Sequence, residues 1–229
     1  MSYRLHYAPD NASLIVRMVL LEMQQPFETV LVDRSRREQD SAAYRALNPS
    51  GLIPVLETPQ GPLFETGAIL LWLTEQHGVL GAEEAQRGLF LKWLFMLSNT
   101  LHAEMRMLFY PEVYVGPDSF AQRALHDRLQ TSIPAHLQKL EAIAPNAPYL
   151  LSDRLTVLDF YLCALLRWLA LYPKTLAGWF DLSATPRLAR IAATLQQLDS
   201  VQAAQQAEGL GPTPFTAPIY ATPPEGSAT

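Results

Sequence analysis

The stretch of sequence that decides the fold runs from residue 48 to residue 69. It reads Asn48-Pro49-Ser50-Gly51-Leu52-Ile53-Pro54-Val55-Leu56 and later Leu63-Phe64-Glu65-Thr66-Gly67-Ala68-Ile69. Its first four residues have the composition of a turn. The segments 55–58 and 63–65 have the length and composition of short strands, and Pro59-Gln60-Gly61 between them indicates a tight connection. We therefore expect an antiparallel hairpin that leads into a helix over 67–76.

The residues before this stretch predict a strand, a helix and a second strand. Residues 3–7 and 27–32 have the aromatic and β-branched content of strands. Residues 12–23 carry apolar side chains at helical spacing, with Arg17 and Glu22 expected to point outward. Short joints between such elements predict a parallel pair with a right-handed crossover. Residues 1–77 should thus form one α/β domain with the order β-α-β followed by β-β-α.

The rest of the chain predicts helices without strands. Residues 78–88 read as a linker, and residues 89–210 as an all-helical domain. The expected helices span 85–109, 119–143, 157–171 and 186–208. The tail over 211–229 contains five prolines and is flexible by composition. We expect Phe215, Ile219 and Tyr220 to pack it against the helical domain.

Composition excludes several classes of protein. The chain has 229 residues, 49% of them hydrophobic, with a net charge of -5, which excludes wholesale disorder and gives no overall attraction to nucleic acid or anionic membranes. Cys163 is the one cysteine, so neither an internal disulfide nor a cysteine-built metal site can form, and we expect no metal. The first residues lack a signal-peptide pattern, and the apolar runs are too short to span a bilayer. We expect a cytoplasmic protein.

The two quoted segments resemble the cytosolic glutathione S-transferase superfamily. That family has N-P-x-G-x-V-P-x-L followed by L-x-E-S-x-A-I, and this chain differs in having Ile53 for Val and Thr66 for Ser. The resemblance implies a thioredoxin-like glutathione-binding domain followed by an all-α domain. It also implies glutathione as co-substrate and a homodimer.

The resemblance implies where glutathione would bind. The peptide bond before Pro54 should be cis, with the Ile53 backbone facing the cysteinyl part of the ligand. Glu65 and Thr66 should hold the γ-glutamyl group at a helix start that Thr66 caps with its hydroxyl. Gln39 should lie near the glycyl carboxylate. The alternatives are a trans proline that starts a strand and a solvated glutamate beside an ordinary cap.

A second signature lies at Thr156-Val157-Leu158-Asp159, which has the S/T-x-x-D spacing of a capping box. The family places this box at the start of a central helix of its second domain. We interpret it as a folding signal, and Cys163, one turn further along, as a core residue.

Glutathione chemistry requires a thiolate, whereas a free thiol has a pKa of ~8.5. A hydroxyl or amide at the first helix start could supply the missing stabilisation. Ser13 is the first candidate, because serine-type members of the family place the activating hydroxyl there, although it could be an ordinary cap. Asn11 is the alternative. Tyr7 resembles the activator of tyrosine-type members in lying on the first strand, although we expect it in the core. Asp10 is expected in a turn.

The segment 8–14 is similar to the bacterial beta-class pattern S-P-G-A-C-S-L, but Ala12 stands at the position of the cysteine. Mixed-disulfide chemistry is therefore excluded at that position. β-Etherase-like members of the family also lack this cysteine. The chain thus most resembles the beta-class and β-etherase-like members.

The electrophile is expected to bind in a hydrophobic pocket between the domains. Met105, Phe109 and Tyr110 recur at helical spacing and could form its wall, although such a stripe also suits a core. His102 could face the same cleft or lie within the helical bundle. We expect a detoxifying transferase that attacks a hydrophobic electrophile. The alternatives are a non-catalytic ligand-binding or protein-interaction module and glutathione-dependent ether cleavage or dehalogenation.

Overall fold

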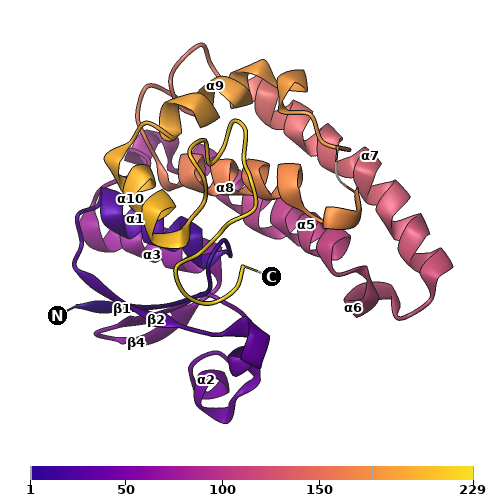
Figure 1. Ribbon diagram of the computed structural model, residues 1–229. Helices are drawn as coiled ribbons and strands as arrows, with labels where there is room; N and C mark the ends of the chain where they lie inside the picture. The colour runs from indigo at the N-terminus through magenta and orange to yellow at the C-terminus, as the bar shows by residue number, and fades with distance from the viewer. Residues whose placement is uncertain (1, 177, 229) are drawn as a thin grey trace. The chain divides into compact units, whose positions relative to one another are not determined.

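The computed structural model describes residues 2–176 and 178–228. The chain forms two compact units, one of Met1–Gly81 with Leu195–Thr229 and the other of Ala82–Thr194 (Figure 1). The sequence predicts that residues 195–210 belong to the helical domain and that the tail packs on it. The structure instead groups both with the first unit, because α10 (Asp199–Glu208) packs along α1 (Ser13–Glu22).

The first unit contains a four-stranded mixed sheet in the order β2-β1-β3-β4. Its strands are β1 (Tyr3–Tyr7), β2 (Phe27–Leu31), β3 (Val55–Thr58) and β4 (Gly61–Phe64). β1 is parallel to β2 and antiparallel to β3, and β3 is antiparallel to β4, which confirms the predicted β-α-β and β-β order. β4 begins earlier than expected and ends before Glu65, whose φ of 69° leaves the strand conformation.

Three helices accompany this sheet. α1 buries nearly all of its residues, and it contacts both α10 and α3 (Thr66–His77). α3 ends at Gly78, where a φ of 68° suits the left-handed conformation that glycine adopts without strain. α2 (Ala42–Leu47) is capped by Ser41, whose Oγ accepts the Tyr44 N–H at 3.1 Å.

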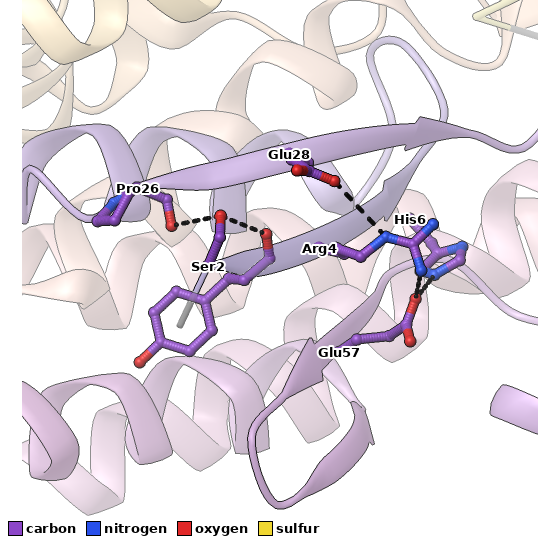
Figure 2. Close-up of polar contacts among 7 residues, drawn as sticks. Ser2, Arg4, His6, Pro26, Glu28 and Glu57 are labelled. Atoms are coloured by element: carbon purple, nitrogen blue, oxygen red, sulfur yellow. Dashed lines mark hydrogen bonds and ion pairs between the residues drawn. The ribbon is translucent and has the colours of Figure 1, made fainter.

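A charged cluster crosses three strands of the sheet (Figure 2). Glu57 of β3 accepts a hydrogen bond from Arg4 at 3.0 Å and pairs with His6 at 2.7 Å, and both partners lie on β1. Arg4 also lies 3.8 Å from Glu28 of β2. Since alternate strand residues point to opposite faces, Arg4 and His6 share one face while the buried Leu5 lies on the other. The His6 ring packs on Tyr44, so this face carries α2.

The second unit is helical throughout its regular structure. Its helices are α4 (Arg87–Phe95), a π-helical turn (Met96–Leu101), α5 (His102–Phe109), α6 (Pro111–Val115), α7 (Ser119–Ile143), α8 (Val157–Leu171) and α9 (Pro186–Leu195). α7 and α8 have the predicted bounds. The helix expected over 85–109 is interrupted by the π-helical turn, and the one expected over 186–208 is broken between α9 and α10. Within residues 2–176 and 178–228, no helix combines the length and apolar character that crossing a membrane requires.

The capping box at the start of α8 is confirmed. One carboxylate oxygen of Asp159 accepts the Thr156 N–H at 2.8 Å and the other accepts the Leu150 N–H at 2.7 Å. Asp159 is fully buried, and this burial raises the pKa of its carboxyl to about 6. Cys163 is likewise fully buried, as expected of a core residue. The box thus fixes the entry of α8 by hydrogen bonds made within ten residues of sequence.

Candidate functional site

Four connecting segments meet at one edge of the sheet. Tyr7 at the end of β1 pairs with Leu31 at the end of β2, and His6 pairs with Val55 at the start of β3. Val55 in turn pairs with Phe64 at the end of β4. Because of these pairings, the loops after β1, β2 and β4 and the loop before β3 leave the sheet on the same side. We call this side the carboxyl edge of β1.

The carboxyl edge brings together most of the predicted glutathione-binding residues. Ile53 and Pro54 stand directly before β3, and the peptide bond between them is cis, as predicted. Glu65 follows β4 with an exposed side chain and occupies the N-cap position of α3. Thr66 is the first residue of α3 and not its cap, so the predicted capping role is wrong. The first N–H groups of a helix have no partners within it, so this corner suits an anion.

The loop after β2 contains Gln39. Its side-chain oxygen is buried and has no hydrogen-bond partner among the described residues. The two arginines that precede it are paired with carboxylates of their own loop, Arg37 with Asp40 and Arg36 with Glu38. In this loop the side-chain oxygen of Gln39 thus lacks a hydrogen-bond donor, whereas the charges of Arg36 and Arg37 are balanced by neighbouring carboxylates.

The candidates for thiol activation differ in how their polar groups are used. Ser13 is fully buried, and its hydroxyl donates to the Ala8 carbonyl at 3.0 Å and accepts the Ala8 N–H at 3.3 Å. Asn11 is partly buried, and its side-chain oxygen accepts the Ala12 N–H at 2.8 Å. Its Nδ2 group has no hydrogen-bond partner within the described chain. The hydroxyl of Ser13 thus braces the loop, whereas the amide of Asn11 presents a donor.

Tyr7 is engaged by the far end of the chain. Its hydroxyl donates to the carboxylate of Glu225, and burial together with this bond raises the pKa of the phenol. The guanidinium carbon of Arg17 lies 4.5 Å from the centre of the same ring. The Tyr7 hydroxyl therefore already donates its hydrogen bond to a carboxylate of the tail.

The tail turns back at Gly209 and reaches the carboxyl edge through two further contacts. The Gly209 carbonyl accepts the Thr222 N–H at 2.8 Å, which turns the chain back. A Cβ on Gly226 would come within 2.7 Å of Leu31 and 3.3 Å of Pro9. The Ala228 carbonyl accepts a hydrogen bond from Arg34 at 2.9 Å. The predicted packing of the tail on the helical domain gives way to contacts with the first unit, which its proline-rich composition did not reveal.

The residues predicted for the electrophile lie on α5 and just after it, in the helical unit. Met105 is fully buried, whereas Phe109 is partly buried with its ring 6.1 Å from that of Tyr172. Tyr110 is 38% exposed, the most open of the set. His102 bonds to the Tyr161 hydroxyl at 2.9 Å, and burial lowers the pKa of its ring to about 4, with the charge of Arg106 adding to the effect. Of these residues, Phe109 and Tyr110 keep accessible apolar surface.

Sequence reasoning missed two charged residues next to the loop after β1. Arg17, expected to point outward, is buried and bonds to Glu208, which is fully buried at the end of α10. No local pattern links residues so far apart in the chain. Among the described residues there is also no group of three or more potential metal ligands.

Comparison with known proteins places the chain in a family. Residues 12–76 match the family model described as the N-terminal domain of glutathione S-transferase, and residues 123–194 match the C-terminal domain. Glutathione S-transferase GST-4.5 of Xanthomonas campestris is 29% identical over 211 residues, which cover 90% of this chain and 99% of that protein.

Two solved structures extend the comparison to the fold. A ternary complex of BphK, a bacterial glutathione S-transferase, is 28% identical with a TM-score of 0.75 over 90% of this chain and all of that one. A glutathione transferase homologue from Sulfitobacter with bound glutathione has a TM-score of 0.78 at 21% identity, covering 89% of this chain and 97% of that one. With both domain models matched in order, the chain belongs to the glutathione S-transferase superfamily.

Proposed function

We propose that the protein is a glutathione transferase that binds glutathione at the carboxyl edge of β1 and activates its thiol there. The observation that carries this proposal is the convergence at that edge of the loop with Asn11, the Ile53–Pro54 segment and the Glu65–Thr66 corner. The names of the relatives support it, because the Xanthomonas protein is called a glutathione S-transferase and the Sulfitobacter structure contains glutathione.

The groups at this edge complement the ends of glutathione. The free N–H groups at the start of α3 suit the γ-glutamyl carboxylate, and the exposed carboxylate of Glu65 suits the ammonium beside it. The Ile53 backbone would pair with the cysteinyl residue, whose orientation would then direct the sulfur toward the loop after β1. Gln39 would meet the glycyl end.

The activating group that we propose is the side-chain amide of Asn11. Lowering the thiol pKa from ~8.5 by about two units requires about 2.7 kcal/mol of preference for the thiolate. A hydrogen bond to a charged group contributes about 1.5–3 kcal/mol. Ser13 and Tyr7 donate their hydroxyl protons to Ala8 and Glu225 respectively. Asn11 presents a donor that is not spent in this way.

The electrophile and the assembly belong to the same proposal. An apolar electrophile would use the accessible surface of Phe109 and Tyr110, with Met105 and His102 supporting it from within the helical unit. We also propose that the protein acts as a homodimer in the cytoplasm. Sedimentation equilibrium would test the dimer, and a single species at the monomer mass would contradict it.

The variant Asn11→Ala tests whether the Asn11 amide lowers the thiol pKa of bound glutathione, and Ser13→Ala serves as the matched comparison at the neighbouring candidate. The pKa of bound glutathione is read from the ultraviolet absorbance of its thiolate, and affinity from calorimetric titration. We expect the unmodified protein to lower the thiol pKa by about two units. Asn11→Ala should return it toward the value in free solution and reduce kcat by roughly 10- to 100-fold, the size of a lost transition-state interaction.

Ser13→Ala should lower thermal stability more than it changes the thiol pKa. Loss of the thiolate in Ser13→Ala but not in Asn11→Ala would identify the serine as the activator instead. Glutathione that binds with an unshifted thiol would indicate a non-catalytic binding module. Turnover of aryl ethers or haloarenes alone, with no reaction of generic electrophiles, would indicate ether cleavage or dehalogenation.

A further inference from the structure

α10 packs along α1, and the contacts at its two ends show that the helices are antiparallel (Figure 1). At the start of α10, the Ser200 hydroxyl donates to the carboxylate of Glu22 at 2.5 Å, at the end of α1. At the end of α10, Glu208 reaches the beginning of α1 and the loop before it. The pairing of these helices therefore carries a carboxylate from the far end of the chain to the carboxyl edge of β1.

Both oxygens of Glu208 are occupied. One accepts the backbone N–H of Asp10 at 2.7 Å, and the other accepts the Nε–H of Arg17 at 2.7 Å. Both residues are buried: 0% of the surface of Glu208 and 7% of that of Arg17 is accessible to solvent. Burying such an ion pair costs several kcal/mol of desolvation per ion, and well-packed apolar residues often stabilise a core as well or better. The pair therefore calls for a role beyond stability.

The loop that Glu208 contacts contains a residue in an uncommon backbone conformation. Asp10 has a φ of 50°, in the left-handed region that residues other than glycine seldom occupy, although aspartate enters it more readily than most. The bond from Glu208 fixes its N–H immediately before Asn11. On the other side, the Ser13 hydroxyl fixes Ala8 through both its carbonyl and its N–H. Asn11 is thus flanked by two clamps, one local and one from α10.

We propose that Glu208 is a positioning residue for thiol activation, which orients the amide of Asn11 by holding Asp10. This inference rests on the proposed function and goes beyond it, since Glu208 itself touches no part of the ligand. Its effect would pass through one backbone hydrogen bond. A residue with a merely structural role would instead change stability and leave the thiol pKa of bound glutathione unchanged.

The test compares four variants by three readouts: the thiol pKa of bound glutathione, kcat and KM measured separately, and the unfolding midpoint. Glu208→Ala and the double variant Arg17→Met/Glu208→Met both remove the acceptor for Asp10, and the double variant also removes the unpaired charge. Glu208→Gln keeps an acceptor oxygen of the same reach. Ser200→Ala breaks the other end of the helix pair and serves as control.

We expect Glu208→Ala and the double variant to raise the thiol pKa toward the free value and to lower kcat by about tenfold or more, because small misplacements of a reacting group are costly. The KM for glutathione should change by no more than about twofold, since the groups proposed to bind its two ends are intact. Glu208→Gln should restore most of kcat. Ser200→Ala should match the unmodified protein in thiol pKa and in kcat, with only a small drop in the unfolding midpoint.

Several outcomes would overturn the inference. A folded double variant with the original thiol pKa and kcat would show that the Asp10 bond is dispensable. Loss of activity in Glu208→Gln as large as in the double variant would show that the negative charge of Glu208 matters and that an acceptor for the Asp10 N–H is not enough. If the unmodified protein binds glutathione without shifting its thiol pKa, the proposed function fails first, and the role of Glu208 fails with it.

Discussion

Asp159 and Glu208 are two fully buried carboxylates whose partners lie at very different distances along the chain. Asp159 bonds to Thr156 and Leu150, three and nine residues away. Glu208 bonds to Arg17 and Asp10, 191 and 198 residues away. Burial raises the pKa of both carboxyls, to about 6 and about 7 respectively.

The difference shows which buried charges a sequence reveals. The hydrogen bonds of Asp159 follow from the spacing of a capping box, so they are predictable from four residues. Glu208 looks like the last polar residue of an amphipathic helix, and its partner Arg17 looks like an outward-facing one. One carboxylate organises its own helix start, whereas the other joins two distant segments of a unit.

The largest expected effect is on stability when Glu208 is removed. Glu208→Ala leaves Arg17 buried without its partner, and breaking a buried pair in this way typically costs about 3–5 kcal/mol. Urea denaturation measures the change in unfolding free energy. Arg17→Met/Glu208→Met should recover most of it, because the unpaired charge is gone. A loss below about 1 kcal/mol in Glu208→Ala would contradict this, because it would show that the buried pair contributes no more to stability than a typical surface ion pair.

A smaller loss is expected at Asp159. Asp159→Ala leaves the N–H groups of Leu150 and Thr156 without their acceptor, at about 1–3 kcal/mol for each group. It leaves no buried charge unpaired, whereas Glu208→Ala strands Arg17 as well as the Asp10 N–H. Thr156→Ala, which removes only a side chain of the box, should cost about 1 kcal/mol. The same denaturation series measures both. If Asp159→Ala destabilised the protein more than Glu208→Ala, the local carboxylate would be the more important one.

The dependence of stability on pH should separate the two carboxylates. Each carboxyl has a higher pKa in the folded protein than in the unfolded chain. At a pH between the unfolded and the folded pKa of a carboxyl, the folded protein therefore binds more protons than the unfolded chain. Both therefore make stability fall as pH rises, Asp159 between about 4 and about 6 and Glu208 between about 4.5 and about 7. The groups that face Glu208 are Arg17, Asp10 and Tyr7.

Glu208→Gln should flatten this fall up to pH 7, and Asp159→Asn should flatten only the part below pH 6. Denaturation at half-unit steps of pH measures both slopes. A stability that rises through this window and rises less in Glu208→Gln would show that Arg17 outweighs burial and keeps Glu208 ionised.

The smallest effect is expected at the other end of the helix pair. Ser200→Ala removes one hydrogen bond to Glu22, for which about 0.5–1.5 kcal/mol is typical. Differential scanning calorimetry should detect a small drop in Tm. A loss comparable to that of Glu208→Ala would mean that the helix pair is held along its whole length and not chiefly at its loop end.

The sheet and most helices were predictable, because their signals are local. Alternation, turn residues and the capping box identified the four strands and the bounds of α7 and α8. The break between α9 and α10 was not predictable, since residues 196–198 contain neither glycine nor proline. The segments that gather at the carboxyl edge followed from motif order. The use of the Ser13 hydroxyl did not, because it depends on where Ala8 lies after folding.

The fold-back at Gly209 has a practical consequence for handling the protein. Its φ is +63°, and a Cβ there would lie 2.0 Å from the backbone oxygen of Thr222. Any other residue would therefore push the tail segment around Thr222 away from the helix end. With that turn intact, the described tail finishes against Arg34, on the side of the sheet where β1 ends. An affinity tag attached after the tail would therefore lie near the loops that follow β1 and β2. A tag attached before β1 would lie near the opposite end of that strand.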